Sequence, residues 1–273
     1  MKIFKTLVKE FFAVAFAIIF TIPVILVLTN SFKTQAELFK SFIALPTSFN
    51  INNYVKAWEN MKFFHTLTNT LICTVFGVTG IIIISSMMAY KIARMNEKIG
   101  TALLIFFVLP MMIPFQTIMI PLMKVITFLH LQSTLHGYIL VCIALVSPFT
   151  IFLIRGFVAQ LPIALEEAAF IDGANVYQTF FFIVFPCLKP VIVTALILNT
   201  LWVWNEFSLS LLMLSKQETM TLQITVYRYF GAYALNWDVA LATLVLASFP
   251  IIIFYILMQN QIQKNIVAGS IKG

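Results

Sequence analysis

Charged side chains are scarce in this 273-residue sequence, in which Asp, Glu, Lys and Arg together make up 10% of the residues. Hydrophobic residues make up 61%, and the mean hydropathy is +1.00. One soluble core cannot bury that much apolar surface, so the composition excludes an ordinary soluble domain. We therefore expect a lipid bilayer to cover the excess.

Residues that could carry chemistry are equally sparse. The three cysteines lie in apolar stretches without the spacing of a disulfide framework or a zinc site: Cys73, Cys142 and Cys187. The three histidines, His65, His130 and His136, lack metal-site spacing such as H-E-x-x-H. No G-x-x-x-x-G-K-[ST] loop is present to hold ATP phosphates. The sequence therefore predicts no catalytic residue, metal or cofactor in this chain, which argues against an intramembrane enzyme.

Long intervals without Asp, Glu, Lys or Arg predict the membrane spans, because a spanning helix needs about 20 apolar residues. Five intervals qualify: 11–32, 63–90, 99–123, 125–154 and 239–263. A sixth, 180–204, contains Lys189 near its start, where the side chain can reach the interface. We expect an all-α membrane protein with six transmembrane helices and its first apolar run retained as a span.

The basic residues predict the orientation of these spans. They are dispersed along the chain, so the formal charge of +7 does not indicate a nucleic-acid partner. An even number of spans places both termini on one side. The residues expected inside are Lys2, Lys5, Lys9, Lys91, Arg94, Lys98, Arg155, Lys264 and Lys272. This modest excess over the outer set favours both termini in the cytoplasm.

We find no low-complexity run or fixed repeat that divides the chain, so we predict one domain over 1–273, with a core of about 65–263 and a tail of 264–273. Two outer segments are long, about 30–62 and 207–237. The first mixes aromatic and polar residues, which suits either a short helix at the headgroup level or a plain interfacial loop.

The inner segment between spans four and five, about 160–180, is the least lipid-like. Pro162 can open a short helix over residues 163–171, and Asp172-Gly173 breaks it. A second helix then begins near Ala174 and runs into the fifth span. A short helix, a glycine turn and a re-entry into the membrane could form a rigid knob for a partner, although a simple connector could use the same residues.

Several motifs resemble those of known permeases. Glu167-Ala168-Ala169, followed by Gly173, Ile183 and Phe185-Pro186, resembles the EAA loop of binding-protein-dependent ABC importer permeases, with Phe185 where the family usually has leucine. The chain is most similar to the second, maltose-type permease of carbohydrate importers. The further matching motifs are Asn30-Ser31-Phe32-Lys33, Asn53-Tyr54, Asn69-Thr70-Leu71, Trp204-Asn205-Glu206-Phe207 and Gly269-Ser270-Ile271-Lys272-Gly273.

This resemblance implies a MetI-like domain in a bacterial plasma membrane, with the EAA loop as a coupling helix seated on an ATP-hydrolysing subunit. The residues implied in coupling are Glu166, Glu167, Ala168, Ala169, Asp172 and Gly173. It also implies a second permease, a dimer of ATPase subunits that holds ATP and Mg, an extracytoplasmic binding protein and a sugar substrate. Closure of the ATPase dimer would switch the cavity by alternating access.

The solute path is less defined. Polar or aromatic residues in or beside spans suit sugar contacts or equally helix–helix hydrogen bonds: Asn69, Gln116, Thr117, Asn199, Thr200 and Trp202. Trp204, Asn205 and Glu206 are candidates for an outer gate or a binding-protein contact. The cargo could instead be glycerol phosphate, a polyol or another small solute. An ion-driven secondary transporter is disfavoured because neither mid-span charges nor repeats are evident.

Overall fold

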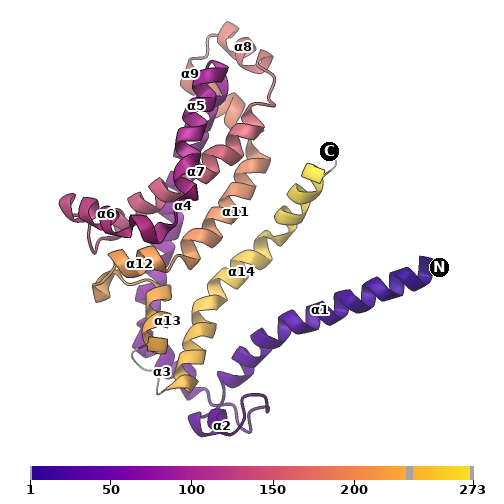
Figure 1. The fold of residues 1–273 in the computed structure, drawn as a ribbon, viewed down its shortest axis with the longest axis vertical. Coiled ribbons are helices and arrows are strands. Elements are labelled where there is room, and N and C mark those ends of the chain that lie inside the picture. The colour runs from indigo at the N-terminus through magenta and orange to yellow at the C-terminus, as the bar shows by residue number, and fades with distance from the viewer. Residues whose placement is uncertain (1, 232–235, 271–273) are drawn as a thin grey trace. The chain divides into compact units, whose positions relative to one another are not determined.

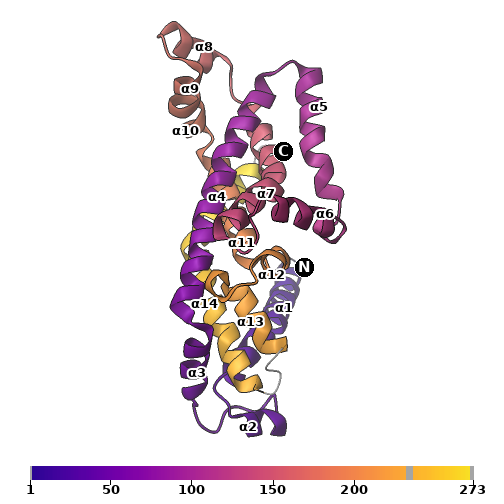
Figure 2. The same ribbon diagram turned by 90° about the vertical axis from the view of Figure 1, so that its left-hand side faces the viewer.

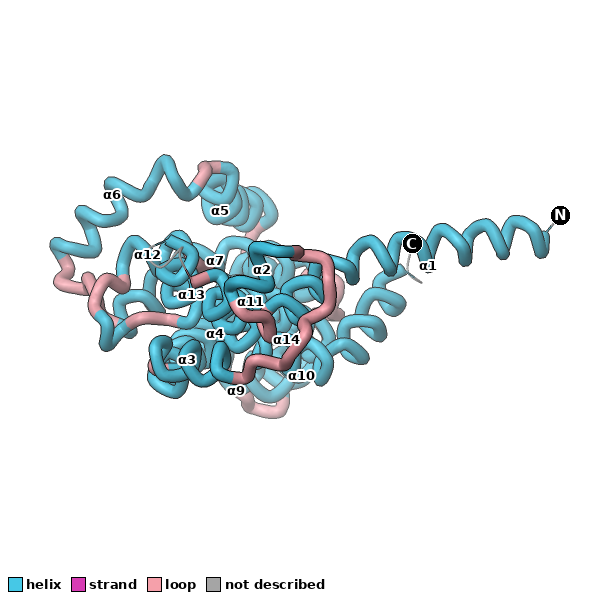
Figure 3. The backbone as a smooth tube through the Cα atoms, turned by 90° about the horizontal axis from the view of Figure 1, so that it is seen from below, coloured by secondary structure: helices cyan, strands magenta, loops and turns pink. Residues whose placement is uncertain are grey.

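The computed structural model describes residues 2–231 and 236–270, and within these ranges the chain forms helices joined by loops (Figure 3). The expected all-α class is confirmed. Part of the C-terminal motif, residues 271–273, lies outside the described residues.

Four helices are long and apolar enough to cross a membrane, and two bent helix pairs raise that number to as many as six. The four are α1 (Lys2–Asn30), α4 (Phe63–Arg94), α7 (Leu135–Val158) and α14 (Trp237–Ser270). Three of them, α1, α4 and α14, cover most of the intervals expected from the scarcity of charge, and α7 begins ten residues after its expected start. The 18-residue apolar window of α1 is 0% buried, as expected of a helix that faces lipid.

The predicted third span, 99–123, is not one straight helix. The structure has α5 (Glu97–Val108), the 3-10 turn η1 (Leu109–Met112) and α6 (Phe115–Phe128), with a bend of 103° between the halves (Figure 2). Pro110 and Pro114 lie at the bend, and each removes a backbone donor that a continuous helix needs. The predicted fourth span, 125–154, likewise starts too early, because α6 ends at Phe128 and α7 begins at Leu135.

The predicted fifth span, 180–204, is also broken. It comprises α9 (Val176–Gln178), a π-helical turn η2 (Thr179–Val184), α10 (Phe185–Cys187) and α11 (Lys189–Asn205). The two halves meet at 79° around Leu188, between Pro186 and Pro190. A charge count cannot detect such a bend, because the apolar run continues through it.

By its internal contacts the chain divides into two compact units. The first comprises Met1–Thr66 and Leu222–Pro250, and includes α2 (Gln35–Lys40), α3 (Asn52–Met61) and α13 (Leu222–Gly231). The segment between α1 and α4 is ordered by the buried Asn53 amide, which donates to the carbonyls of Ser31 at 2.9 Å and Lys33 at 2.8 Å. Of the two alternatives left open for this segment, a short helix or a plain loop, the structure has helices, α2 and α3.

The second unit comprises Leu67–Thr221 and Ile251–Gly273. It contains most of α4, the elements from α5 to α11, α12 (Ser208–Met213), η3 (Gln217–Thr219) and the short helix α8 (Ala164–Ile171) (Figure 1). Within it α7 packs along α11, and α8 lies beyond the ends of α4 and α7 (Figures 1 and 2).

Candidate functional site

The helix α8 has the start and the stop that its sequence predicts. It follows Pro162, and its last turn ends at Asp172. Gly173 has a φ of +86°, which a glycine adopts without strain. The N–H groups of Gly173 and Ala174 then donate to the carbonyls of Phe170 at 3.1 Å and Ala169 at 2.9 Å. These two bonds form a Schellman motif, which satisfies the end of the helix and reverses the chain.

The return into the membrane is also fixed locally. The Asn175 side chain accepts a hydrogen bond from the Gln178 N–H at 3.0 Å, and the Gln178 side chain accepts one from the Asn175 N–H at 2.8 Å. This capping box starts α9, two residues after the position expected from sequence. The π-helical turn η2 follows at once, and such turns are frequent at functional sites.

The six predicted coupling residues divide between two faces of this loop. Glu167, Ala168, Asp172 and Gly173 are exposed, whereas Glu166 and Ala169 are buried. The two buried residues are three positions apart and therefore lie on one side of the helix. Large apolar residues share the exposed surface of the loop: Ile163, Leu165, Phe170 and Ile171. The loop thus presents an apolar surface with acidic residues outside the bilayer-length helices.

Glu166 binds α4 of its own chain. One carboxylate oxygen lies 2.8 Å from Arg94 Nε and 2.7 Å from Arg94 Nη2, and the other accepts a hydrogen bond from the Tyr90 hydroxyl at 2.7 Å. Arg94 Nη2 also donates to the Leu161 carbonyl at 3.1 Å. Glu166 was predicted as a coupling residue, and neither of these partners in α4 was predicted. The signal available was a basic residue, Arg94, just beyond the end of the second predicted span.

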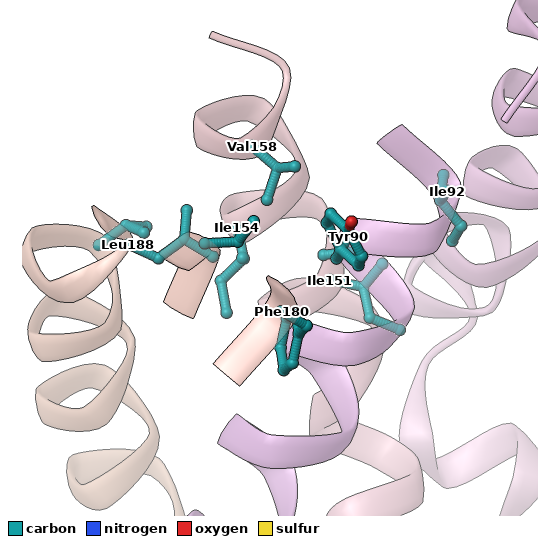
Figure 4. Close-up of a cluster of buried hydrophobic side chains, with 10 residues drawn as sticks. Tyr90, Ile92, Ile151, Ile154, Val158, Phe180 and Leu188 are labelled. Atoms are coloured by element: carbon teal, nitrogen blue, oxygen red, sulfur yellow. The ribbon is translucent and has the colours of Figure 1, made fainter. Parts of the chain in front are cut away.

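A hydrophobic cluster lies beneath this contact and joins α4, α7, η2 and α11 (Figure 4). The ring of Tyr90 lies 5.3 Å from that of Phe180 in η2, between centroids. The other buried residues labelled in the figure are Ile92, Ile151, Ile154, Val158 and Leu188. Because cores of this kind are closely packed, η2 is held firmly against the end of α4.

Three of the predicted solute-path residues line one cavity of about 690 Å³ in the second unit: Gln116, Asn199 and Trp202. Glu206 also lines it, together with Pro114 and other residues of the α5–α6 bend. Burial raises the pKa of the Glu206 carboxyl above its ordinary value, an effect that the N–H groups of Leu209 and Ser208 partly offset. The cavity thus combines amides, an indole ring and a carboxyl group, which can bind hydroxyl groups and stack on a sugar ring.

The other candidates in this set have different positions. Asn69 is buried, and its amide donates to the carbonyls of Glu218 at 2.9 Å and Met220 at 3.0 Å, so it holds the loop after α12. Thr117 is exposed and Thr200 is buried, and neither lines the cavity. Asn199 lines the cavity and also bonds Thr150 of α7, with its amide nitrogen 3.0 Å from the hydroxyl.

Of the gate candidates, Glu206 lies at the cavity, as described above, and Trp204 is buried. Asn205 is exposed, and its amide donates to the Leu201 carbonyl at 2.8 Å. Within residues 2–231 and 236–270, His, Cys, Asp and Glu do not form a group of three or more that could hold a metal ion.

Comparison with known proteins identifies the class. Residues 81–267 match the model of the family described as binding-protein-dependent transport system inner membrane component. AmyC of Thermoanaerobacterium thermosulfurigenes, named as a probable starch degradation products transport system permease, is 34% identical over 96% of this chain and 95% of its own. MelC of Bacillus subtilis, the melibiose/raffinose/stachyose import permease, is 31% identical over 92% and 91% of the two chains.

A chain in the crystal structure of a bacterial ABC transporter that imports the acidic polysaccharide alginate has a similar fold. Its TM-score is 0.79 and its identity 25%, over 93% of this chain and 95% of that chain. The family match covers more than half of the sequence and includes α8 and the clustered helix ends around it. The chain therefore belongs to the inner membrane components of binding-protein-dependent ABC importers, as a permease subunit and not as an enzyme.

Proposed function

We propose that this permease carries a sugar or an oligosaccharide across a bacterial plasma membrane, as one of two homologous permease subunits of an importer. The observation that carries the proposal is α8, which presents acidic and apolar side chains on a rigid turn at one end of the second unit. The relatives named above are a probable permease for starch degradation products and an import permease for melibiose, raffinose and stachyose. Their near full-length similarity supports a saccharide as the cargo.

The exposed side of α8 is the part that would contact a dimer of ATPase subunits. Ala168 allows close backbone approach, and Glu167 and Asp172 offer charge-assisted hydrogen bonds to a basic partner. ATP and Mg would be held by the ATPase pair, and closure of that pair would move α8. The ATPase subunits then act on this chain through their contact with α8. A displacement of α8 shifts the equilibrium between the two states of the solute cavity, one open to each side of the membrane.

This arrangement requires α8 in the cytoplasm, which in turn requires both termini of a six-span chain in the cytoplasm. The excess of Lys and Arg in the same set of short loops supports that orientation. The opposite ends of the spans would then meet an extracytoplasmic binding protein. A periplasmic protein with a bound alginate pentasaccharide accompanies the related alginate transporter in one crystal structure.

The cavity residues favour a neutral cargo. The described residues that line this cavity include the half-buried Glu206 and no Lys or Arg, so they offer a phosphate or carboxylate no counter-charge. Trp202 and Gln116 suit ring stacking and hydroxyl contacts. A sugar or polyol therefore fits this cavity better than glycerol phosphate does.

The test is transport by the whole importer, purified through an affinity tag on this chain and reconstituted with its binding protein. We expect a second permease and an ATPase to copurify, and ATP-dependent uptake of radiolabelled raffinose or of a malto-oligosaccharide. Glycerol 3-phosphate and alginate oligosaccharides are the matched anionic probes. Uptake without ATP, or copurification without any ATPase, would contradict the proposal.

A further inference from the structure

We infer that Tyr90, Arg94 and Glu166 form a clamp that fastens α8 to the inner end of α4, so that any displacement of α8 is passed directly to α4. The inference rests on the proposed coupling role of α8 and assigns positioning roles to three residues, two of which have no part in that proposal. The three residues are called the Glu166 clamp below.

The clamp fixes α8 at two points. Arg94 approaches one oxygen of Glu166 through both Nε, at 2.8 Å, and Nη2, at 2.7 Å. Its Nη2 also reaches the carbonyl of Leu161, just before α8, at 3.1 Å. Tyr90 occupies the second carboxylate oxygen of Glu166 at 2.7 Å. With both oxygens engaged from one helix, α8 cannot rotate or slide relative to α4 without breaking several charge-assisted hydrogen bonds.

Burial raises the free-energy cost of breaking these bonds. The side chain of Glu166 is 6% exposed and that of Arg94 is 16% exposed. A solvated ion pair contributes little to stability. A buried pair that loses one partner leaves the other charge buried without a counter-charge, which is strongly destabilising. By contrast, Lys91 in the same last turn of α4 and Glu167 next to Glu166 are both exposed. The chain thus places one charged pair inside and leaves its neighbours at the surface.

The helix α4 extends this attachment across the bilayer. It runs as one helix from Phe63 to Arg94 without a proline, whereas α7 contains Pro148 and α6 contains Pro121. At its other end the buried Asn69 holds the carbonyls of Glu218 and Met220. From Asn69 to Tyr90 the helix spans about 32 Å at 1.5 Å per residue. One helix therefore links α8 to an outer loop of the second unit.

The first test is the number of solute molecules taken up per ATP hydrolysed by the reconstituted importer. We expect Glu166→Gln and Arg94→Ala each to lower this ratio by at least about fivefold, the lower end of typical coupling effects. Tyr90→Phe, which retains the ring packing on Phe180, should lower it less. Lys91→Ala is the matched control and should retain the normal ratio, because Lys91 is an exposed cation in the same turn.

The charge-exchanged double variant Arg94→Glu with Glu166→Arg separates pairing from mere stability. If the clamp acts through the pair, the double variant recovers part of the ratio that either single exchange loses. A second measurement is the distance between spin labels at Lys91→Cys and Ala164→Cys, with the exposed Cys187 replaced by serine. We expect the same distance without nucleotide and with trapped ATP, and a changed or broader distribution in the Glu166→Gln background.

Three results would overturn the clamp: normal ratios in the Glu166 and Arg94 variants, no recovery in the exchanged pair, or a label distance that changes with ATP in the intact clamp. In each case uptake and ATP hydrolysis by the unmodified importer would still support the proposed function. Failure of that unmodified importer to couple ATP hydrolysis to uptake would instead refute the proposed function itself.

Discussion

Substitution of Gly173 gives the most specific test, because the backbone conformation of this residue and the space around it lead to separate predictions. Its φ of +86° lies in the left-handed region, where a residue with a Cβ costs about 1–2 kcal/mol more than glycine. An added Cβ would meet no atom of the described chain within 4 Å. Within this chain, therefore, alanine and tryptophan at this position should carry the same backbone cost, and the Cβ of either meets no neighbour.

Gly173→Ala and Gly173→Trp should accordingly lower the stability of the isolated permease by equal amounts, about 1–2 kcal/mol each. This loss is small beside a typical folding free energy of about 5–15 kcal/mol, so both variants should insert and fold. Gly173→Asn should lower the stability of the permease by less, because asparagine tolerates the left-handed conformation. Thermal unfolding in one detergent, followed by tryptophan-independent probes such as exposure of Cys73, measures these differences.

Transport should separate the two variants. If the surface around Gly173 is seated on an ATPase subunit, the indole must displace partner atoms, and Gly173→Trp should lose at least about tenfold in uptake while Gly173→Ala loses little. Uptake and ATPase rates of the reconstituted importer provide the assay. Equal uptake by the two variants would refute a partner at this surface. A much less stable tryptophan variant would refute the open space around Gly173.

Three further predictions concern the framework. Asn69→Ala should leave two loop carbonyls without their amide donor, at a cost of about 1–3 kcal/mol, seen as faster hydrogen exchange over 217–221. Hydrogen bonds from Thr47 and Thr34 lower the pKa of Glu37 from 4.5 to about 2. The stabilisation of α2 by the ionised carboxylate is therefore complete above pH 4.5 and is lost as the pH falls toward 2. Limited proteolysis should detect this pH dependence in the unmodified protein and not in Glu37→Gln. Gly137→Ala would place its Cβ 2.5 Å from a backbone carbonyl and should cost about 1–3 kcal/mol in thermal unfolding.

Much of the fold follows from where charge is missing. The intervals 63–90 and 239–263 correspond to α4 and α14 because an uninterrupted apolar run of that length is best satisfied as a helix in lipid. The bends at Pro114 and Leu188 were not predicted, since proline within an apolar run signals either a kink or a tolerated helix interior, and only the surrounding packing decides.

The loop that contains α8 was predictable for the same local reasons. Pro162, Asp172 and Gly173 specify the start and end of α8, so the helix appears within one residue of the expected range. The orientation of Glu166 was not predictable, because it depends on a contact with Arg94, 72 positions away in the sequence. Asn69 likewise has its partners about 150 positions away, so its sequence context left a sugar contact and a structural hydrogen bond equally open.

The central claim is that the exposed side of α8 transmits force from an ATPase, and crosslinking tests it most directly. A photoreactive amino acid in place of Ala168 samples the exposed side of the helix without touching the Glu166 clamp. We expect it to crosslink to the ATPase subunit of the assembled importer, with a yield that changes when ATP is trapped. Crosslinks only to lipid or to the binding protein, or reaction with a membrane-impermeant reagent from outside intact cells, would contradict the account.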